Sequence, residues 1–563
     1  MNDIDEIIRS ITLKNAIEHQ GKARIDSVIS KLIGIKPEIR NDIKNIIGNV
    51  KTIVNDVNNL TIEEQRRQFE KLNKLYEEKK EEKGYILPPL PNVKDSVITR
   101  FPPEPNGYPH IGHAKAAIIN EEYAKMYKGK LILRFDDTNP LKERIEYYDA
   151  ILSGLNWLEV KPDLIKNTSD DMKMLYDYAK ILIKNDGAYV CKCKQEEIKE
   201  NRRLGIACKC RGRDIDRTMI EWDKMFNEYK ENQAILRFKG DLSSDNTTMR
   251  DPTLFRIIDA EHPKQGKRYR VWPTYDFAAP IEDSIDNVTH AMRSKEYELR
   301  NDLYYAILDR LGLRKPLVIE FSRLEFDGMP VSKRMLKPLI EAKKVQGWDD
   351  PRLPTLLALK RRGILPSSIR EFVLSLGFTK ADTKPPFTKL EAINRKILDP
   401  ISIRLFFVKD PIKMKIDDMP SMISIRLKNH PDKDLGYREI KLDNELYISS
   451  DDLCNLKIGD EIRLLELFNV KIDSIDGIIH AKYTGNELKQ IPRIQWVSKG
   501  VEINVLVAKQ LYLDNKFNEN SLEVIKGYAE EYVDRLENGS RVQFVRFGFC
   551  ILDEARKFIL THK

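Results

Sequence analysis

The feature that most constrains the fold is a proline-rich stretch, Arg100 to His113, that joins a predicted strand to a predicted helix. The β-branched run Asp95–Thr99 precedes it, and Ala114–Met126 follows with good helix formers and no proline. An α/β sheet usually binds nucleotides at such a strand-to-helix turn. His110 and His113 lie three residues apart at the predicted helix start, near free backbone N–H groups. The stretch therefore predicts a polyphosphate site, with a surface loop carrying two histidines as the alternative.

The composition indicates a large globular protein of roughly three to five domains. The chain has 563 residues, of which 41% are hydrophobic and 33% charged. It has no run of about 18 apolar residues, so no membrane partner is expected. The acidic start, Met1–Ser10, lacks the apolar core of a signal peptide, which argues against secretion and favours the cytoplasm. The net charge of +8 permits nucleic-acid binding without establishing it.

Residues 1–93 are predicted to form an appended helical domain. Thr61 is a predicted N-cap with Glu64 three residues later, and the helix that it begins continues to Lys83. Gly84 and the three prolines that follow end this helix and predict a stiff linker. The many charges favour a solvated helix face, with RNA contact as the alternative.

A second strand signal carries acidic residues at its end. The run Lys130–Phe135 has the pattern of a buried strand, and Asp136 follows it directly. A carboxylate just past the end of a central strand is well placed to bind a ligand cation such as an α-ammonium group. The alternative for Asp136 is a helix cap, and one residue among 136–139 is expected to cap the next helix.

Four of the six cysteines form two Cys-x-Cys pairs, which indicates a metal site rather than a disulfide framework. Four thiolates can hold one tetrahedral ion with no position left for water, which is the pattern of a structural zinc site. The alternative is four reduced thiols without a ligand. The predicted ligands are Cys191, Cys193, Cys208 and Cys210.

The middle of the chain supplies three further candidates. Tyr275 lies in a predicted strand-to-loop element and can point its hydroxyl into a pocket, or it is an ordinary core tyrosine. Arg293, at a predicted helix start, offers a charged fork that suits a carboxylate. Lys333 lies in a mobile loop after the Asp327–Gly328 turn and can neutralise a departing pyrophosphate. Residues 259–275 are predicted to be strands with turns.

Beyond residue 346 the pattern changes twice. Residues 347–398 are predicted to be largely helical. Short alternating strands with turn residues dominate from Ile403 to Phe549, and this spacing is typical of β-barrels.

The two loops together resemble the signature motifs of class I aminoacyl-tRNA synthetases. Pro103–His113 corresponds to the HIGH region and Val331–Arg334 to the KMSKS loop, where Val331 replaces the usual methionine. The resemblance extends from about Val97 to the C-terminus. It is strongest to the archaeal-type glutamyl-tRNA synthetases, whose body is similar to that of the glutaminyl-tRNA synthetases.

This resemblance implies a multidomain α/β fold. The catalytic domain is a Rossmann-type parallel sheet in two halves, 94–185 and 263–345, separated by an acceptor-end-binding insertion at 186–262. A helical connector at 346–398 and two anticodon-binding β-barrels at 399–563 follow. A monomer is expected.

The resemblance also implies a two-step reaction with ATP and Mg²⁺. His110 and His113 hold phosphate oxygens, Gly112 packs under adenine, and Lys333 with Ser332 steadies the pyrophosphate. The implied ATP site comprises Pro103, Glu104, Pro105, Asn106, Gly107, Tyr108, Pro109, His110, Ile111, Gly112, His113, Arg323, Leu324, Val331, Ser332, Lys333 and Arg334. The implied amino-acid site comprises Arg100, Asp136, Tyr275 and Arg293.

Arg293 is the position that separates glutamate from glutamine. Glutamyl enzymes resemble this sequence there, whereas glutaminyl enzymes carry a small neutral residue. The expected substrates are therefore L-glutamate, ATP and tRNA(Glu), and charging of tRNA(Gln) is left open. The alternatives are a glutaminyl-tRNA synthetase, a small-molecule ligase of the same superfamily, a tRNA-binding paralogue and a truncated enzyme that glutamylates a tRNA base.

Overall fold

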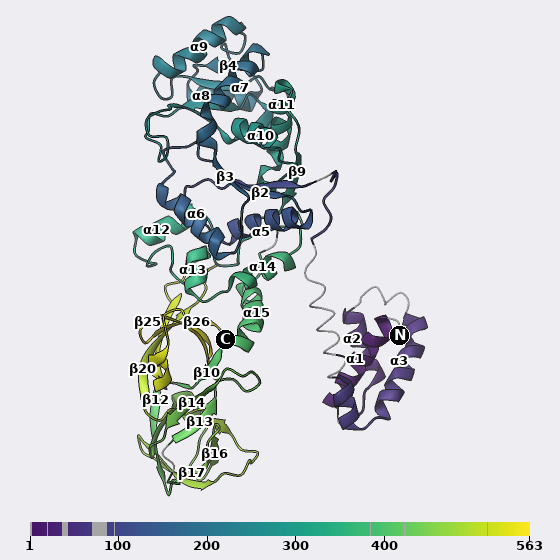
Figure 1. The fold of residues 1–563 in the computed structure, drawn as a ribbon, viewed down its shortest axis with the longest axis vertical. Helices are drawn as coiled ribbons and strands as arrows, with labels where there is room; N and C mark the ends of the chain where they lie inside the picture. The colour runs from purple at the N-terminus through teal and green to yellow at the C-terminus, as the bar shows by residue number, and fades with distance from the viewer. Residues whose placement is uncertain are drawn as a thin grey trace. The chain divides into compact units, whose positions relative to one another are not determined.

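The computed structural model describes residues 3–19, 21–35, 43–69, 72, 87–94, 96–382, 384–421, 424–514 and 516–563. The chain forms two compact units, Met1–Ile86 and Leu87–Lys563, and each is described by itself (Figure 1). Among the described residues, no helix combines the length and the apolar character needed to cross a membrane.

The first unit is helical, as predicted. Helices α1 (Asp3–Glu18), α2 (Ile25–Ile35) and α3 (Ile43–Asn58) share a buried aliphatic core. The predicted capping box is present, since the backbone N–H of Thr61 donates to Glu64 Oε2 (3.0 Å) and that of Glu64 donates to Thr61 Oγ1 (3.3 Å). Most of the predicted continuation of this helix to Lys83 lies outside the described residues.

The second unit is built on a parallel sheet. Strands β1 (Ile98–Phe101), β2 (Lys130–Phe135) and β3 (Leu164–Asn167) pair in parallel, as do β8 (His290–Ser294) and β9 (Leu317–Phe321). The backbone N–H of Thr289 donates to the carbonyl of Ile98 (2.9 Å), which places β8 beside β1. The resulting order is β3-β2-β1-β8-β9. The strand order reverses between β1 and β8, and open α/β sheets bind ligands at such a switch point.

Helices cover this sheet and carry much of its core. α5 (Ile111–Met126) and α6 (Ile145–Trp157) do so. α10 (Tyr275–Ile285) and α11 (Asn301–Leu311) bury their apolar side chains in a second core, which they share with the four-stranded sheet described next. Apolar side chains of α5, including Ile118, are fully buried against β1 and β2, where Leu133 is also fully buried. The two ends of the predicted nucleotide turn are therefore held by packing.

A four-stranded antiparallel sheet lies between β3 and β8 in the chain. It consists of β4 (Ala188–Cys191), β5 (Ile235–Phe238), β6 (Thr253–Ile257) and β7 (Val271–Pro273). Helices α7 (Met172–Lys184), α8 (Gln195–Leu204) and α9 (Ile215–Asn227) accompany it (Figure 1). The predicted strands at 259–275 are wrong except for β7. The imidazole of His262 accepts the backbone N–H groups of Lys264 and Gln265, which bends this segment into a turn.

Four helices follow the parallel sheet in the chain: α12 (Lys333–Glu341), α13 (Leu356–Arg361), α14 (Pro366–Ser375) and α15 (Phe387–Leu398). Arg370 of α14 forms ion pairs with Glu121 and Glu122 of α5. The helical region therefore fastens to the helix that follows the predicted nucleotide turn.

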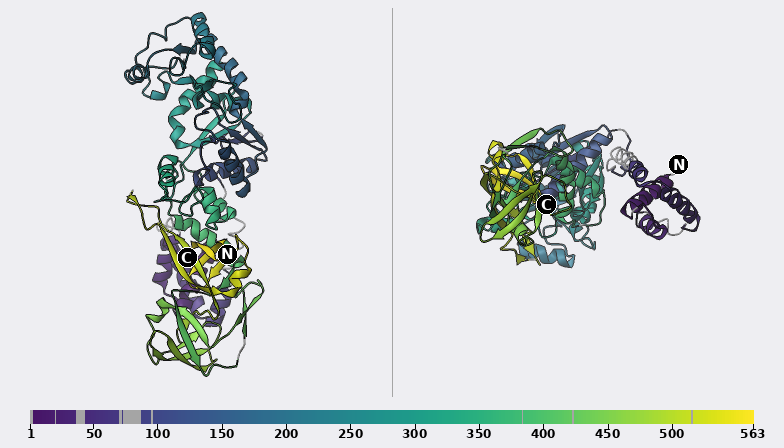
Figure 2. Two further views of the ribbon diagram at one scale, coloured as in Figure 1. Left: turned by 90° about the vertical axis from the view of Figure 1, so that its left-hand side faces the viewer. Right: turned by 90° about the horizontal axis from the view of Figure 1, so that it is seen from below.

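The C-terminal region forms two sheets that nearly close, as the strand spacing predicted (Figures 1 and 2). The first contains β10 (Ile403–Leu405), β24 (Arg541–Phe544), β25 (Gly548–Glu554), β26 (Lys557–His562), β20 (Gly500–Ala508), β23 (Leu522–Glu530) and β11 (Phe407–Lys409). Its two edge strands, β10 and β11, are consecutive in the chain, so its edges meet.

The second sheet is inserted between β11 and β20. It contains β15 (Glu445–Ser449), β12 (Pro411–Asp417), β18 (Ile479–Gly485), β17 (Asn469–Ile475), β16 (Glu461–Leu464) and β19 (Arg493–Ile494). A bridge between Tyr447 and Val497 brings its edges together. The remaining pairs are β13 (Ser424–Lys428) with β14 (Tyr437–Lys441), and β21 (Tyr512–Leu513) with β22 (Lys516–Phe517).

Candidate active site

A cavity of about 880 Å³ opens beside the segment that follows β1. Most of the predicted site residues line it: Arg100, Pro103, Glu104, Asn106, Gly107, Tyr108, His110, Gly112, His113, Asp136, Tyr275, Arg293, Arg323, Leu324, Val331, Ser332 and Lys333. Pro105, Pro109, Ile111 and Arg334 are not among the lining residues. Segments that are far apart in the sequence thus converge on one space.

The two histidines cap the helix that they begin. His110 is the N-cap residue of α5, and its Nδ1 accepts the backbone N–H of Gly112 (3.1 Å). His113 Nδ1 accepts the backbone N–H of His110 (3.2 Å), and the ring centroids are 4.0 Å apart. A neutral imidazole has one acceptor and one donor nitrogen, so both rings carry their proton on Nε2.

Both histidines are neutral near pH 7. Burial and the neighbouring His113 and Arg323 hold the pKa of His110 well below its ordinary value. Burial lowers the pKa of His113 to about 4. The cavity therefore presents two N–H donors that add no positive charge of their own, and their orientation is set by the helix cap.

Glycine at position 112 is required by the first of these rings. A Cβ atom there would lie 2.9 Å from His110 Cε1 and 3.4 Å from the carbonyl oxygen of Leu324. A larger residue would displace either the capping imidazole or the segment at Leu324. The helix cap alone thus accounts for the glycine.

The segment Trp348–Leu356 packs against the turn Arg100–His113 and holds it through backbone hydrogen bonds. The backbone N–H of Ile111 donates to Pro354 O (3.0 Å), and that of Leu356 donates to Pro109 O (2.9 Å). The rings of Tyr108 and Trp348 stack at 5.5 Å. Pro109 and Ile111 therefore support the cavity from outside it.

Lys333 reaches the same turn from the other side. It is the first residue of α12, its Nζ donates to the carbonyl oxygen of Asn106, and it lies 4.7 Å from the centre of the Tyr147 ring. Burial and the nearby cation Lys337 lower its pKa. The prediction that Lys333 lies in a loop is wrong, because this residue begins α12, but the segment does contact the histidine-bearing turn.

Arg293 lies in β8, and the prediction of a helix start is wrong. Its backbone pairs in register with Glu320 of β9, and the residue is only 6% exposed. One guanidinium nitrogen donates to Asn301. Its Nε is buried and has no hydrogen-bond partner among the described residues. Because the residue also lines the cavity, its guanidinium is suited to a ligand carboxylate at this edge.

Asp136 faces the cavity and caps no helix. Its Oδ1 accepts the hydroxyl of Thr168 (3.2 Å) and lies 3.6 Å from Arg134 Nε. The N-cap residue of α6 is Arg144, which makes no side-chain cap bond, so the cap expected among residues 136–139 is wrong for this helix. Asp137 is buried and accepts the hydroxyl groups of Tyr148 and Ser169 instead.

Several basic residues of the cavity wall were not predicted. They are Lys115, Lys142, Arg202, Arg256 and Arg300. No local motif marks them, because they come from segments that only the tertiary structure brings to the cavity. They make the space more suitable for an anionic ligand.

The four cysteines gather at a separate place in the insertion. All four are buried, and their sulfur atoms lie within 4.8 Å of one another. The buried guanidinium of Arg237 lies 3.9 Å from the sulfur atoms of Cys191 and Cys208. A cation beside these sulfur atoms favours thiolates over thiols.

Known proteins resemble the chain along its whole length. The model of the catalytic domain of class I tRNA synthetases (E and Q) matches residues 96–400. Two anticodon-binding domain models of the same class match residues 402–485 and 493–553.

Individual relatives also match the chain over nearly its whole length. The glutamate–tRNA ligases of Nitrosopumilus maritimus (strain SCM1) and Cenarchaeum symbiosum (strain A) are 51% and 48% identical to the chain, over all of both chains. That of Pyrococcus furiosus is 41% identical over 98% of each. The chain therefore belongs to the family of class I tRNA synthetases for glutamate and glutamine.

Proposed function

We propose that this protein joins L-glutamate to the 3′ end of tRNA(Glu) in two steps. An oxygen of the glutamate α-carboxylate attacks the α-phosphorus of ATP, forming glutamyl-adenylate and releasing pyrophosphate. A terminal ribose hydroxyl of the tRNA then attacks the acyl carbon, and AMP leaves as the hydroxyl proton is lost. The observation that carries this proposal is the guanidinium of Arg293, 6% exposed, in the wall of the cavity that the two neutral histidines also line. The glutamate–tRNA ligases that match the full chain support it.

At the ATP end, the residues stabilise charge and form no covalent bond. The Nε2–H groups of His110 and His113 donate to phosphate oxygens, whose negative charge builds up in the transition state. Lys333 leaves its contact with the Asn106 carbonyl and pairs with the departing pyrophosphate. ATP enters with Mg²⁺, which screens the phosphate charges.

At the amino-acid end, opposite charges hold the two ends of glutamate. Asp136 pairs with the α-ammonium group, with the hydroxyl of Tyr275 nearby. The guanidinium of Arg293 pairs with the γ-carboxylate, and Arg100 lies in the wall of the same pocket. Glutamine would leave the charge of Arg293 without a partner, so the pocket rejects the amide.

The affinity for glutamate should depend on pH through Asp136. Burial raises the pKa of this carboxyl to about 6, although the Arg134 guanidinium opposes the shift. Below that pH the group is protonated and no longer attracts an ammonium ion. We expect the KM for glutamate to rise about tenfold for each pH unit below 6 and to stay level above 7. Initial rates between pH 5 and 8 measure this.

Two controls accompany this prediction. The KM for ATP should show no break near pH 6, and Asp136→Asn should give a high KM for glutamate that does not vary across the range. A level profile in the unaltered enzyme would contradict the role of Asp136.

The four cysteines fit a structural zinc site. The donors are four buried sulfur atoms close enough to share one ion, and no fifth protein ligand is needed. When bound, zinc would cross-link the residues around β4 with the loop after α8. Cys191, Cys193, Cys208 and Cys210 would hold it as thiolates.

Purified protein should contain about one equivalent of zinc by elemental analysis. Cys210→Ser should lose the metal and lower the melting temperature, because one corner of the site is missing. Cys454→Ser is the matched control, since Cys454 is exposed and lies outside the cluster. This variant should keep the zinc and the melting temperature of the unaltered protein. Less than about half an equivalent in fresh protein would contradict the site.

Glutamate-dependent ATP–pyrophosphate exchange, measured with and without tRNA, tests the proposed function. We expect exchange with glutamate in the presence of tRNA(Glu) and none with glutamine. Exchange with glutamine alone would identify a glutaminyl enzyme. Absence of any exchange would identify a tRNA-binding paralogue. Aminoacylation of purified tRNA(Gln) then decides whether one or two tRNA pools are charged.

A further inference from the structure

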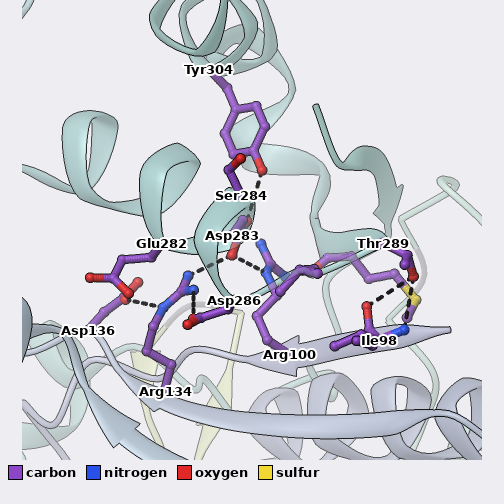
Figure 3. A network of polar contacts seen from close by, with 12 residues as sticks. Ile98, Arg100, Arg134, Asp136, Glu282, Asp283, Ser284, Asp286, Thr289 and Tyr304 are labelled. Carbon is purple, nitrogen blue, oxygen red and sulfur yellow. Dashed lines mark hydrogen bonds and ion pairs between the residues drawn. The ribbon is translucent and has the colours of Figure 1, made fainter. Parts of the chain in front are cut away.

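A single buried carboxylate, Asp283 of α10, lies behind the amino-acid end of the cavity (Figure 3). Its Oδ1 accepts from Arg100 Nε (3.0 Å) and from Arg134 Nη2 (2.7 Å). Its Oδ2 accepts the hydroxyl of Tyr304 (3.0 Å). Asp283 and both arginines are fully buried, and Tyr304 is 3% exposed.

Each contact of Asp283 leads to a residue of the proposed glutamate pocket. Arg100 is itself a pocket residue. Arg134 places its Nε 3.6 Å from Asp136, the proposed partner of the α-ammonium. The ring of Tyr304 lies 5.1 Å from the guanidinium of Arg293, the proposed partner of the γ-carboxylate.

The fourth pocket residue is tied to Asp283 through the backbone. Tyr275 is the first residue of α10, the helix that carries Asp283 two turns later. The ammonium end and the carboxylate end of the pocket therefore share one support.

The charges require this carboxylate to be ionised. Two guanidinium groups without exposure to water need a negative partner close by. Burial alone would raise the pKa of Asp283, but Arg100 and Arg134 lower it to about 2. The support therefore remains charged over the whole working range of pH.

We propose that Asp283 is a positioning residue that sets the spacing between the two charged ends of the glutamate pocket. It touches no substrate and acts through Arg100, Arg134 and Tyr304. The inference rests on the proposed function. It predicts that weakening this support raises the KM for glutamate and leaves the KM for ATP alone, because the histidines are held by the cap of α5 instead.

Two neighbouring carboxylates, Glu282 of α10 and its C-cap residue Asp286, contact the same ion network. Asp286 contacts Arg134 Nη1 (3.1 Å) and Lys166 (2.9 Å), and Glu282 contacts Lys166 (2.8 Å). Among the described residues, Glu282 forms no hydrogen bond or ion pair with Arg100, Arg134 or Tyr304, whereas Asp286 does contact Arg134. Glu282→Gln is therefore a matched control that weakens the ion network at Lys166 without cutting any of the three links of Asp283.

Tyr304→Phe is the mildest test, because it removes one hydroxyl and keeps the ring beneath Arg293. We expect the KM for glutamate to rise about threefold to tenfold, because only part of the free energy of one hydrogen bond to a charged group is lost from glutamate binding. Asp283→Asn removes the negative charge and should raise the KM for glutamate about thirtyfold or more. In both variants the KM for ATP should stay within about twofold, and in Glu282→Gln the KM for ATP and the KM for glutamate should both do so.

The double variant Asp283→Asn with Tyr304→Phe completes a cycle. If Tyr304 acts through Asp283, the double variant should show the KM of Asp283→Asn alone rather than the product of the two effects. If Asp283→Asn does not fold, Tyr304→Phe and the control Glu282→Gln decide the question.

The outcomes separate this inference from the proposed function. Unaltered protein that activates no glutamate would overturn the proposed function itself. Active protein in which Tyr304→Phe changes neither constant, or changes both equally, would overturn the positioning role of Asp283. A rise confined to the KM for glutamate supports it.

Discussion

His110→Asn is expected to lower the rate of glutamate activation about 10²- to 10³-fold without unfolding the protein. The Oδ1 of asparagine can replace His110 Nδ1 as the acceptor for the Gly112 N–H, so the cap of α5 is kept. The shorter side chain has nothing at the position of Nε2, so the proposed phosphate donor is lost. The kcat of tRNA-dependent ATP–pyrophosphate exchange measures the loss, and the melting temperature checks the fold.

His110→Gln makes the opposite change. Its amide can reach the position of Nε2 and donate there, but it does not present the same short-range cap acceptor. We expect it to keep more activity than His110→Asn and to be less stable by about 1 kcal/mol. Activity of His110→Asn within tenfold of the unaltered enzyme would show that the Nε2 donor is not used in catalysis.

Arg293→Ala is expected to lower kcat/KM for glutamate about 10²- to 10⁴-fold, mainly by raising KM. This is the usual loss of about 3–5 kcal/mol when one partner of a buried charge pair is removed. The guanidinium is 6% exposed and its Nε has no partner among the described residues, so water cannot readily replace it. Steady-state aminoacylation at varied glutamate concentrations gives both constants.

Arg293→Lys is the matched control, because it keeps the positive charge and removes the planar guanidinium group. It should restore part of the affinity, because a lysine pairs with a carboxylate at one point only. The KM for ATP should change little in either variant, and the melting temperature should be compared because Arg293 also contacts Asn301. Unchanged glutamate kinetics in Arg293→Ala would refute the assignment of this residue.

The sequence predicted well those features that depend on neighbouring residues. The turn between β1 and α5 followed from a β-branched run, a proline-rich stretch and a helix-forming segment. The capping box at Thr61 and Glu64 followed from their spacing of three residues, because one turn of a helix brings such residues into contact. The cysteine cluster followed from two short pairs that needed only one chain reversal to meet.

The sequence predicted poorly where distant pairing decides local structure. Arg293 was assigned to a helix start, but its segment is held as a strand by β9, and that pairing has no local signal. The C-terminal strands were predicted, yet their distribution was not: one sheet is inserted between β11 and β20 of the other. Strand order depends on long-range contacts that alternating hydrophobicity does not encode.

The stretch Arg100–His113 shows most clearly which properties follow from the sequence and which from the tertiary structure. The sequence by itself determined that two histidines with a glycine between them lie at a helix start. It also determined that the segment Val331–Arg334 matches them as a second motif, because each motif is a short run of neighbouring residues. Only the tertiary structure decided that His110 and His113 cap α5 through Nδ1 and are neutral. It alone placed Asp283 behind Arg100, Arg134 and Tyr304. Protonation and charge pairing depend on burial, and burial is produced by segments that meet only in the folded chain.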